Sequence, residues 1–290
     1  MPGECAGGRG SKKPLVQRVE PAIRVVLAAV VLLLLSSGGV HGQWLNYPTS
    51  GIPRLPGGEP NLAAPPPRTA DGKPDFSGMW QVATRLPCND VTRICTDLPI
   101  SAQFVNLGAG LKDGLPYQPW AKEQMARKGP ADDPYTRCLT PGGPRMHLLP
   151  TMKKVVQTPA LLLILNEFNA SYRQVFLDAR PLPVDPQPTW NGYSSARWDG
   201  DTLEVASIGF RDDQWLDAAG SPLTNAAKVT ERFRRLNFGS MQVQVTVDDP
   251  KSYAHPWTAT VDLAAVLDTE LLDSACWENE KDVEHLRNAK

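Results

Sequence analysis

Six charged residues in the second half of the chain are of the types that acid–base chemistry requires: Glu167, Arg173, Arg197, Glu204, Glu231 and Arg232. Glutamates can act as general acid and base on a sugar or another small molecule, and arginines can hold an anionic group or stabilise an enolate. We assign the acid and base roles to the three glutamates, and electrophilic support to Arg197 and Arg232. The alternative is that these side chains form solvated pairs between strands, each with a small effect on stability.

Aromatic side chains near these charges suggest the walls of a binding site. The chain has 8 tryptophans, and sugars and flat apolar molecules both stack on such rings. The ligand-binding candidates are Tyr193, Trp198, Arg173 and Trp190. In the alternative interpretation the tryptophans pack in the core and bind nothing.

Other chemistry has little support in the sequence. The histidines His147, His255 and His285 lack the H-E-x-x-H or H-x-H spacing of a zinc site, although acidic residues precede His285. There is no G-x-S-x-G of a serine hydrolase, no phosphate-binding loop and no G-x-G-x-x-G after a strand. We therefore predict neither a metal nor an organic cofactor.

The element that must position the charges is a hairpin over 190–208, with Asp199-Gly200 as its turn. A two-residue loop at that pair would place Trp198 opposite Asp201 and Arg197 opposite Thr202. One face of the hairpin is then apolar, and the other carries Tyr193, Arg197 and Glu204. The second face lies either in water or inside a ligand cavity.

Period-two patterning continues through most of the second half of the chain. The predicted strands, besides the hairpin, are 75–83, 155–157, 160–166, 172–177, 228–236, 241–247, 257–263 and 269–276. Eight or nine strands in meander order predict a mainly β domain, either a single antiparallel barrel or a sandwich, and we favour the barrel.

The remaining segments are expected to be irregular or helical. Residues 43–74 are rich in Pro and Gly and are predicted to form an extended arm, part of which lies against the domain. Residues 75–290 form the β domain, with a loop-rich insertion over 84–150. Helices are predicted within 99–107, over 118–128 and over 279–288, whereas 132–147 is predicted to contain no regular structure.

The N-terminal 42 residues have the order of a secretory signal peptide: basic residues, then the apolar run 25–35, then small residues up to Gly42. Eleven apolar residues are too few to span a membrane comfortably. The sequence therefore predicts export to the periplasm or outside the cell, without stable membrane insertion after cleavage. The formal net charge of -1 and the lack of a basic stripe argue against binding to nucleic acid.

Export changes how the cysteines are interpreted. Removal of the leader would leave Cys88, Cys95, Cys138 and Cys276, an even number in an oxidising compartment, so two disulfides are expected. Three pairings are possible. The short spacing of Cys88 and Cys95 suits a local loop, and Cys138 would then pair with Cys276.

Several phrases along the mature chain resemble an uncharacterised family of secreted bacterial proteins. They are Trp44-Leu-Asn-Tyr-Pro-Thr, Gly72-Lys-Pro-Asp-Phe-Ser-Gly, Arg137-Cys-Leu, Pro144-Arg-Met, Trp198-Asp-Gly-Asp-Thr-Leu-Glu-Val, Val229-Thr-Glu-Arg-Phe and Glu278-Asn-Glu-Lys-Asp-Val-Glu-His. This resemblance implies export and a β-rich fold, and it transfers no activity. In addition, Gly78-Met-Trp80 at the start of the first strand is similar to the signature of lipocalin-type barrels, where the Trp closes one end.

Three functions follow from these patterns. The first is an exported barrel that binds a small hydrophobic or carbohydrate-like molecule, with tryptophan walls and Arg197 and Glu204 as polar anchors. The second is a hydrolase or lyase without cofactor that acts on carbohydrate-like molecules through paired carboxylates. The third is an interaction domain with a filled barrel. The oligomeric state is left open.

Overall fold

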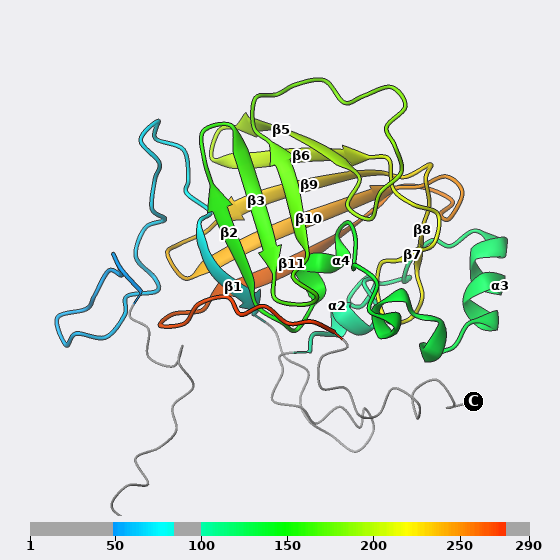
Figure 1. Ribbon diagram of the computed structural model, residues 1–290, viewed down its shortest axis with the longest axis horizontal. Coiled ribbons are helices and arrows are strands. Elements are labelled where there is room, and N and C mark those ends of the chain that lie inside the picture. The colour runs from blue at the N-terminus through cyan, green and yellow to red at the C-terminus, as the bar shows by residue number, and fades with distance from the viewer. Residues whose placement is uncertain (1–48, 84–99, 277–290) are drawn as a thin grey trace, which may run out of the picture. The chain divides into compact units, whose positions relative to one another are not determined.

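The computed structural model describes residues 49–83 and 100–276, which form a closed β-barrel with short helices at one end (Figure 1). Going round the barrel, the strand order is β1-β11-β10-β9-β6-β5-β4-β3-β2. The strands are β1 (Gly78–Val82), β2 (Lys153–Gln157), β3 (Leu161–Asn166), β4 (Tyr172–Phe176), β5 (Tyr193–Asp199), β6 (Thr202–Ile208), β9 (Lys228–Arg235), β10 (Ser240–Asp248) and β11 (Trp257–Ala265). The predicted mainly β fold, and the barrel in particular, is confirmed.

Alternation of side chains divides each strand between the core and the outer surface. In β10, Met241, Val243, Val245 and Val247 are buried, as the period-two pattern predicts. Trp80 of the Gly-x-Trp sequence in β1 is also fully buried, and the Arg235 guanidinium lies 4.8 Å from the centre of its ring. The inner faces of β1, β10 and β11 are therefore apolar throughout.

The barrel departs from a simple meander where β4 meets β5. These strands are parallel and pair only at Phe176 and Ser195, while the other strand pairs in the barrel are antiparallel. A parallel step needs a crossover, and residues 177–192 provide it. We call this junction of β4 and β5 the seam. It is weakly paired, because the start of β4 and the start of β5 lack a ladder of hydrogen bonds.

The central hairpin forms with a different register from the predicted one. Asp199 pairs with Thr202 and Trp198 with Leu203, so the loop is Gly200-Asp201 rather than Asp199-Gly200. Gly200 has φ +60°, which places the glycine at the first loop position, as in a type II′ turn. The register shifts by two residues, and an even shift leaves every side chain on its predicted face.

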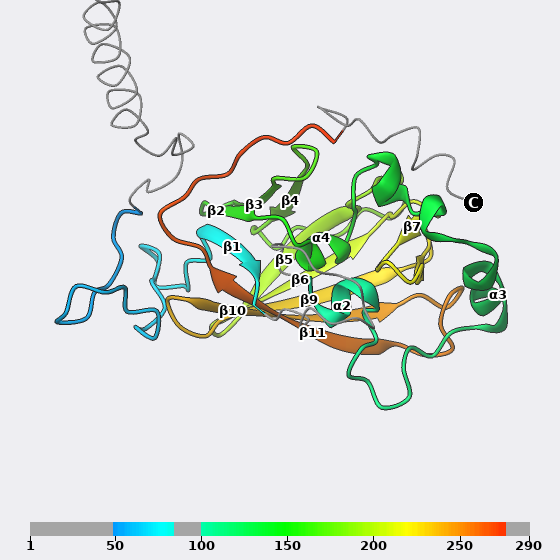
Figure 2. The same ribbon diagram turned by 90° about the horizontal axis from the view of Figure 1, so that it is seen from below.

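The loop-rich insertion closes one end of the barrel. It contains α2 (Ala102–Val105), α3 (Pro119–Arg127), α4 (Arg145–Leu148) and two short 3₁₀ turns at Pro130–Asp132 and Pro134–Arg137. The helix predicted over 118–128 is confirmed by α3, whereas the prediction of no regular structure over 132–147 is wrong. Every residue of 141–150 is buried, and α4 lies between the strands on the two sides of the barrel (Figure 2).

A buried ion pair explains why this proline-rich segment becomes ordered. Both terminal nitrogens of Arg145 donate to the carboxylate of Asp133, each at 2.6 Å. The guanidinium also lies over the ring of Tyr135. A bidentate ion pair fixes the orientation of the guanidinium as well as its distance from the carboxylate. It therefore holds α4 in a defined position in the barrel.

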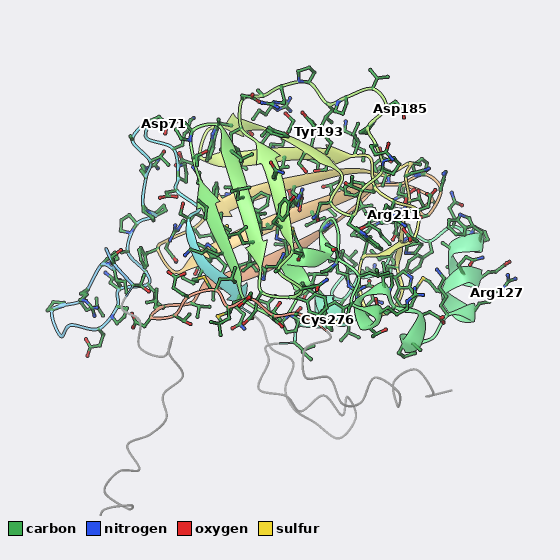
Figure 3. The ribbon with its side chains drawn as sticks, in the orientation of Figure 1. Asp71, Arg127, Asp185, Tyr193, Arg211 and Cys276 are labelled. Carbon is green, nitrogen blue, oxygen red and sulfur yellow. A yellow bond between two sulfur atoms is a disulfide. The ribbon has the colours of Figure 1, made fainter. Side chains whose placement is uncertain are left out.

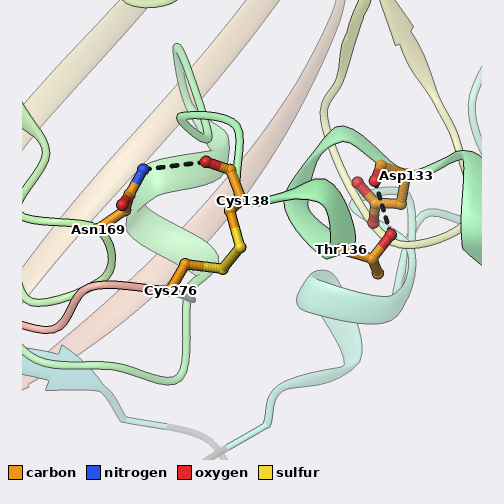
Figure 4. The surroundings of a disulfide bond; sticks show 5 residues. All are labelled: Asp133, Thr136, Cys138, Asn169 and Cys276. Carbon is orange, nitrogen blue, oxygen red and sulfur yellow. Dashed lines mark hydrogen bonds between the residues drawn. A yellow bond between two sulfur atoms is a disulfide. The ribbon is translucent and has the colours of Figure 1, made fainter. Parts of the chain in front are cut away.

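One disulfide links the insertion to the end of the described chain. Cys138 and Cys276 are bonded, with their Cα atoms 5.5 Å apart, as one of the three predicted pairings requires (Figure 4). Asn169, in the turn between β3 and β4, donates to the carbonyl of Cys138 at 3.0 Å. Cys88 and Cys95 lie outside the described residues, as do the predicted leader and the helix over 279–288.

Two further predictions concern the ends of the domain. The described part of the arm, residues 49–74, lies against the barrel: Arg68 pairs with Asp201 at 2.6 Å, and Ala64 is buried. The strand predicted over 269–276 is wrong, since only Ser274 makes an isolated bridge there, to Phe168. Among the described residues, no helix has the length and apolar character needed to cross a membrane.

Candidate functional site

A line of inward polar side chains crosses one side of the barrel interior. Six neighbouring strands, β2, β3, β4, β5, β6 and β9, each contribute at least one buried polar residue. We call this set the polar arc: Lys153, Asn166, Arg173, Ser194, Ser207 and Glu231. Because the opposite wall is aliphatic, the interior is polar on one side only.

At the centre of the polar arc, Glu231 binds two basic side chains. Arg173 donates from one terminal nitrogen to Glu231 Oε1 at 3.0 Å and from the other to Oε2. His147, carried into the barrel by α4, lies 2.8 Å from Glu231 Oε1 through its Nε2. All three side chains are at most 1% exposed. A carboxylate held in this way is fixed in position and shielded from water.

Two serines complete the contacts of Arg173. Its terminal nitrogen donates to Ser207 Oγ at 3.0 Å, and its Nε lies 3.3 Å from Ser194 Oγ. The two hydroxyls are 2.8 Å apart. The guanidinium therefore connects β4 to β5 and β6 across the seam that the backbone leaves weakly paired.

The protonation states follow from burial and from these contacts. Burial alone would raise the pKa of Glu231, but the Arg173 guanidinium and the hydrogen bond from His147 outweigh it and lower the pKa to about 2. Burial lowers the pKa of His147, against the opposing effect of Glu231. Near neutral pH Glu231 is thus ionised and accepts only. The proton of the neutral imidazole is then on Nε2, and Nδ1 carries a lone pair.

The end of the polar arc at β2 and β3 is less well satisfied. Lys153 is 1% exposed, and its only hydrogen bond among the described residues is a long one, 3.5 Å, to the carbonyl of His147. Burial lowers the pKa of Lys153 to about 7. Both polar atoms of the Asn166 side chain, and His147 Nδ1, have no partner within residues 49–83 and 100–276. Buried polar groups without partners are uncommon and often mark a bound water or ion.

A cleft of about 550 Å³ opens on the outer side of the seam. We call it the seam cleft; its lining residues are Thr140, Asn169, Ala170, Ser171, Tyr172, Arg173, Gln174, Phe176, Thr189, Trp190, Asn191, Gly192, Tyr193 and Ser194. Arg173 and Ser194 belong to both the cleft and the polar arc. The seam cleft and the polar arc therefore share a wall at Arg173 and Ser194.

Local contacts hold the aromatic walls of the seam cleft. Asn191 donates to the carbonyl of Tyr172 at 2.8 Å and so joins the two sides of the seam. A side chain at Gly142 would lie 1.8 Å from the carbonyl oxygen of Trp190, so this close approach requires glycine. The guanidinium of Arg211, which is labelled in Figure 3, lies 4.8 Å from the centre of the Trp190 ring.

The predicted cluster of six charges is divided by the barrel wall. Arg197, Glu204 and Arg232 lie on the outer surface, where each arginine donates to one oxygen of Glu204 at 2.5 Å. Arg197 is 72% exposed in its side chain, and Arg232 also pairs with Asp199. The prediction that these three residues line an interior site is wrong; they are the solvated pairs of the alternative interpretation. The physical reason is that Glu231 and Arg232 are consecutive in β9 and must point to opposite faces.

The other predicted residues have different places. Glu167 is half-buried in the turn after β3 and accepts from the backbone N–H of Met152 at 3.1 Å. Trp198 stacks on Phe76 next to the core and does not line the seam cleft. Tyr193, Trp190 and Arg173 do line it. Paired carboxylates are not what the cleft presents, because none of its lining residues is acidic.

Several residues of the site escaped the sequence interpretation. Lys153, Asn166, Ser194 and Ser207 share strand parity with buried aliphatic neighbours, which is the signal that places them inside. In β3 that signal is ambiguous, because residues 161–165 are all aliphatic on both faces. His147 gave no signal, since only the packing of the insertion brings it next to Glu231.

Metal binding finds no support in this geometry. Within residues 49–83 and 100–276, no three His, Cys, Asp or Glu side chains gather as the ligands of a metal would.

No protein-family model matches the sequence, and no curated protein matches it either. What the chain does must therefore be inferred from its own fold and side chains.

Proposed function

We propose that this chain is an exported barrel protein that binds a small, neutral, carbohydrate-like molecule in the seam cleft. The observation that carries the proposal is the composition of the lining. Aromatic rings stand beside side-chain amides and hydroxyls, and the single charge, on Arg173, is matched by Glu231 from within.

This composition favours a polyol over a purely apolar ligand. Trp190, Tyr193 and Tyr172 offer flat faces, and the Tyr172 side chain is well exposed. Asn169, Gln174 and Asn191 add amide groups, and the side-chain oxygen of Asn191 has no partner among the residues that the structure describes. Stacking on rings combined with hydrogen bonds to amides is a way to hold several hydroxyl groups at once.

Export is supported by two independent features. The N-terminal sequence has the order of a signal peptide, and the Cys138–Cys276 bond requires an oxidising environment to form and persist. We expect the chain, expressed in a bacterial host with its leader, to be recovered outside the cytoplasm beginning at Gln43. Mass spectrometry without reduction should show Cys138 linked to Cys276. A cytoplasmic product that keeps its N-terminus and has a free thiol at Cys138 would contradict export.

Binding is tested with four probes: cellobiose, maltose, xylobiose and N,N′-diacetylchitobiose. We expect saturation-transfer NMR to detect at least one of them on the wild-type protein. Calorimetry should then show a loss of affinity of about tenfold or more in Trp190→Ala and in Tyr193→Ala, equivalent to roughly 1.4 kcal/mol.

Two matched variants act as controls. Trp120 is 41% exposed on α3, away from the seam cleft, so Trp120→Ala should bind as the wild type does. Arg197→Ala removes an outward side chain of β5, the strand that carries Tyr193, and should also leave binding unchanged. The proposal fails if none of the four sugars binds, or if Trp120→Ala weakens binding as much as Trp190→Ala.

A further inference from the structure

The charges inside the barrel do not balance. Arg173 and Glu231 neutralise each other through two hydrogen bonds, and His147 is neutral. Two further cationic side chains, Arg235 and Lys153, make no ion pair with any described residue. The Arg235 guanidinium donates to three backbone carbonyls, whereas the Lys153 ammonium has only the long contact to the carbonyl of His147. A buried ammonium needs a counter-charge or must lose its proton, because moving an unpaired ion out of water costs several kcal/mol.

Lys153 lies next to a second buried polar side chain that lacks partners among the described residues. Lys153 and Asn166 are directly opposite each other in the β2–β3 ladder, and both side chains are buried on the inner face. Side chains paired in this way start about 5 Å apart. Among the described residues the Asn166 amide nitrogen has no acceptor, and the Lys153 ammonium has only the long contact to the His147 carbonyl, so two poorly satisfied donors start from the same inner face.

We propose that a monovalent anion of about the size of chloride binds inside the barrel between Lys153 and the amide of Asn166. The anion supplies the missing negative charge and accepts from both donors. Its source is either a free halide or a small carboxylate, which offer the same charge and similar size. This site goes beyond the proposed sugar binding, since its residues do not line the seam cleft.

The proposal implies a link between anion binding and protonation. The anion binds the ammonium form of Lys153, so its affinity should fall as pH rises above the range in which that form persists. The other buried ionisable groups inside the barrel are His147 on α4, Arg173 on β4, and Glu231 and Arg235 on β9. Of these, Glu231 has its pKa lowered to about 2 and stays ionised in the pH range of the test, and burial lowers the pKa of His147, which favours the neutral imidazole. Lys153 is therefore the group that titrates.

The test compares sodium chloride and sodium formate with sodium gluconate, whose anion is too large for the pocket, at equal ionic strength. We expect the Tm of the wild type to rise by about 3 °C or more in chloride or formate at pH 6, in a saturating manner. At pH 9 the shift should largely disappear. The shift should be absent in Lys153→Met at both pH values.

Lys154 provides the matched control. It is the next residue of β2, lies on the outer face and pairs with Glu270 at 2.5 Å. Lys154→Met should keep the full anion-specific shift. An equal shift in wild type, Lys153→Met and Lys154→Met would show a general salt effect and overturn the proposal, as would no difference between chloride, formate and gluconate. Neither result bears on sugar binding, which is measured separately.

Discussion

Replacing Lys153 by methionine is expected to stabilise the protein at neutral pH. Burial lowers the pKa of Lys153 to about 7 from the ordinary lysine value of 10.5. The folded chain must therefore either hold an unpaired charge or give up a proton that the unfolded chain keeps. Methionine has a similar length and no charge, so it avoids this cost. We expect a gain of roughly 3–5 kcal/mol in the free energy of unfolding at pH 6–7.

The same pKa shift makes the free energy of unfolding depend on pH. Between pH 7 and 10.5 the unfolded chain binds a proton on Lys153 that the folded chain does not. The free energy of unfolding of the wild type should therefore rise with pH in this range, by up to about 1.4 kcal/mol per pH unit from this group. The free energy of unfolding of Lys153→Met lacks this dependence on pH. The difference in stability between Lys153→Met and the wild type should therefore be greatest below pH 7 and vanish near pH 10.5.

Urea unfolding in gluconate buffer from pH 6 to 10 measures both effects. Gluconate is used because a bound chloride would stabilise the ammonium and mask the slope. Lys154→Met, on the outer face of the same strand, should keep the wild-type pH slope and change the stability by about 1 kcal/mol or less. A Lys153→Met variant that is less stable than the wild type at pH 6 would contradict the prediction.

Replacing Glu231 should lower the free energy of unfolding, by about as much as Lys153→Met is expected to raise it. Glu231→Gln keeps the shape of the side chain but leaves the buried Arg173 without a counter-charge. The expected loss is about 3–5 kcal/mol, measured by urea unfolding at pH 7. Arg173→Met combined with Glu231→Gln should recover most of it, because no uncompensated charge then remains in the core.

Glu204→Gln is the control for this experiment. Glu204 lies next to Glu231 in the wall, since Val205 pairs with Glu231, but it points outwards. Its loss should cost about 1 kcal/mol or less. The pKa of Glu231 is lowered to about 2, so its contribution is complete above its unfolded pKa and declines as pH falls towards 2. The gap between wild type and Glu231→Gln should thus narrow below pH 4. Equal losses in Glu204→Gln and Glu231→Gln would refute the buried pair.

Much of the fold can be predicted from the sequence because alternation is a local property. The faces of β10 and of the β5–β6 hairpin, the helix at Pro119–Arg127 and the closed β architecture follow from period-two runs, turn residues and proline placement. The hairpin register was displaced by two residues because Asp199-Gly200 and Gly200-Asp201 both make acceptable turns. Only pairing with β9 on the far side of β6 selects between them.

The composition of the site could not be predicted in the same way. A charged residue in a strand is usually outside, and the local pattern of Arg197 and Glu204 is the same whether their face meets water or a cavity. Arg173 and Glu231 face inwards because their strands close into a barrel in which the two side chains neutralise each other. His147 reaches them from a proline-rich segment that has no periodicity of its own.

The sequence by itself determined the β class, the inner and outer face of most strands and the even set of cysteines, since each depends on neighbouring residues or on counting. Only the tertiary structure decided which charges are buried together, where the seam between β4 and β5 opens, and that Cys138 pairs with Cys276. The reason is physical: burial of a charge depends on a partner from a distant strand, and no local pattern records that partner.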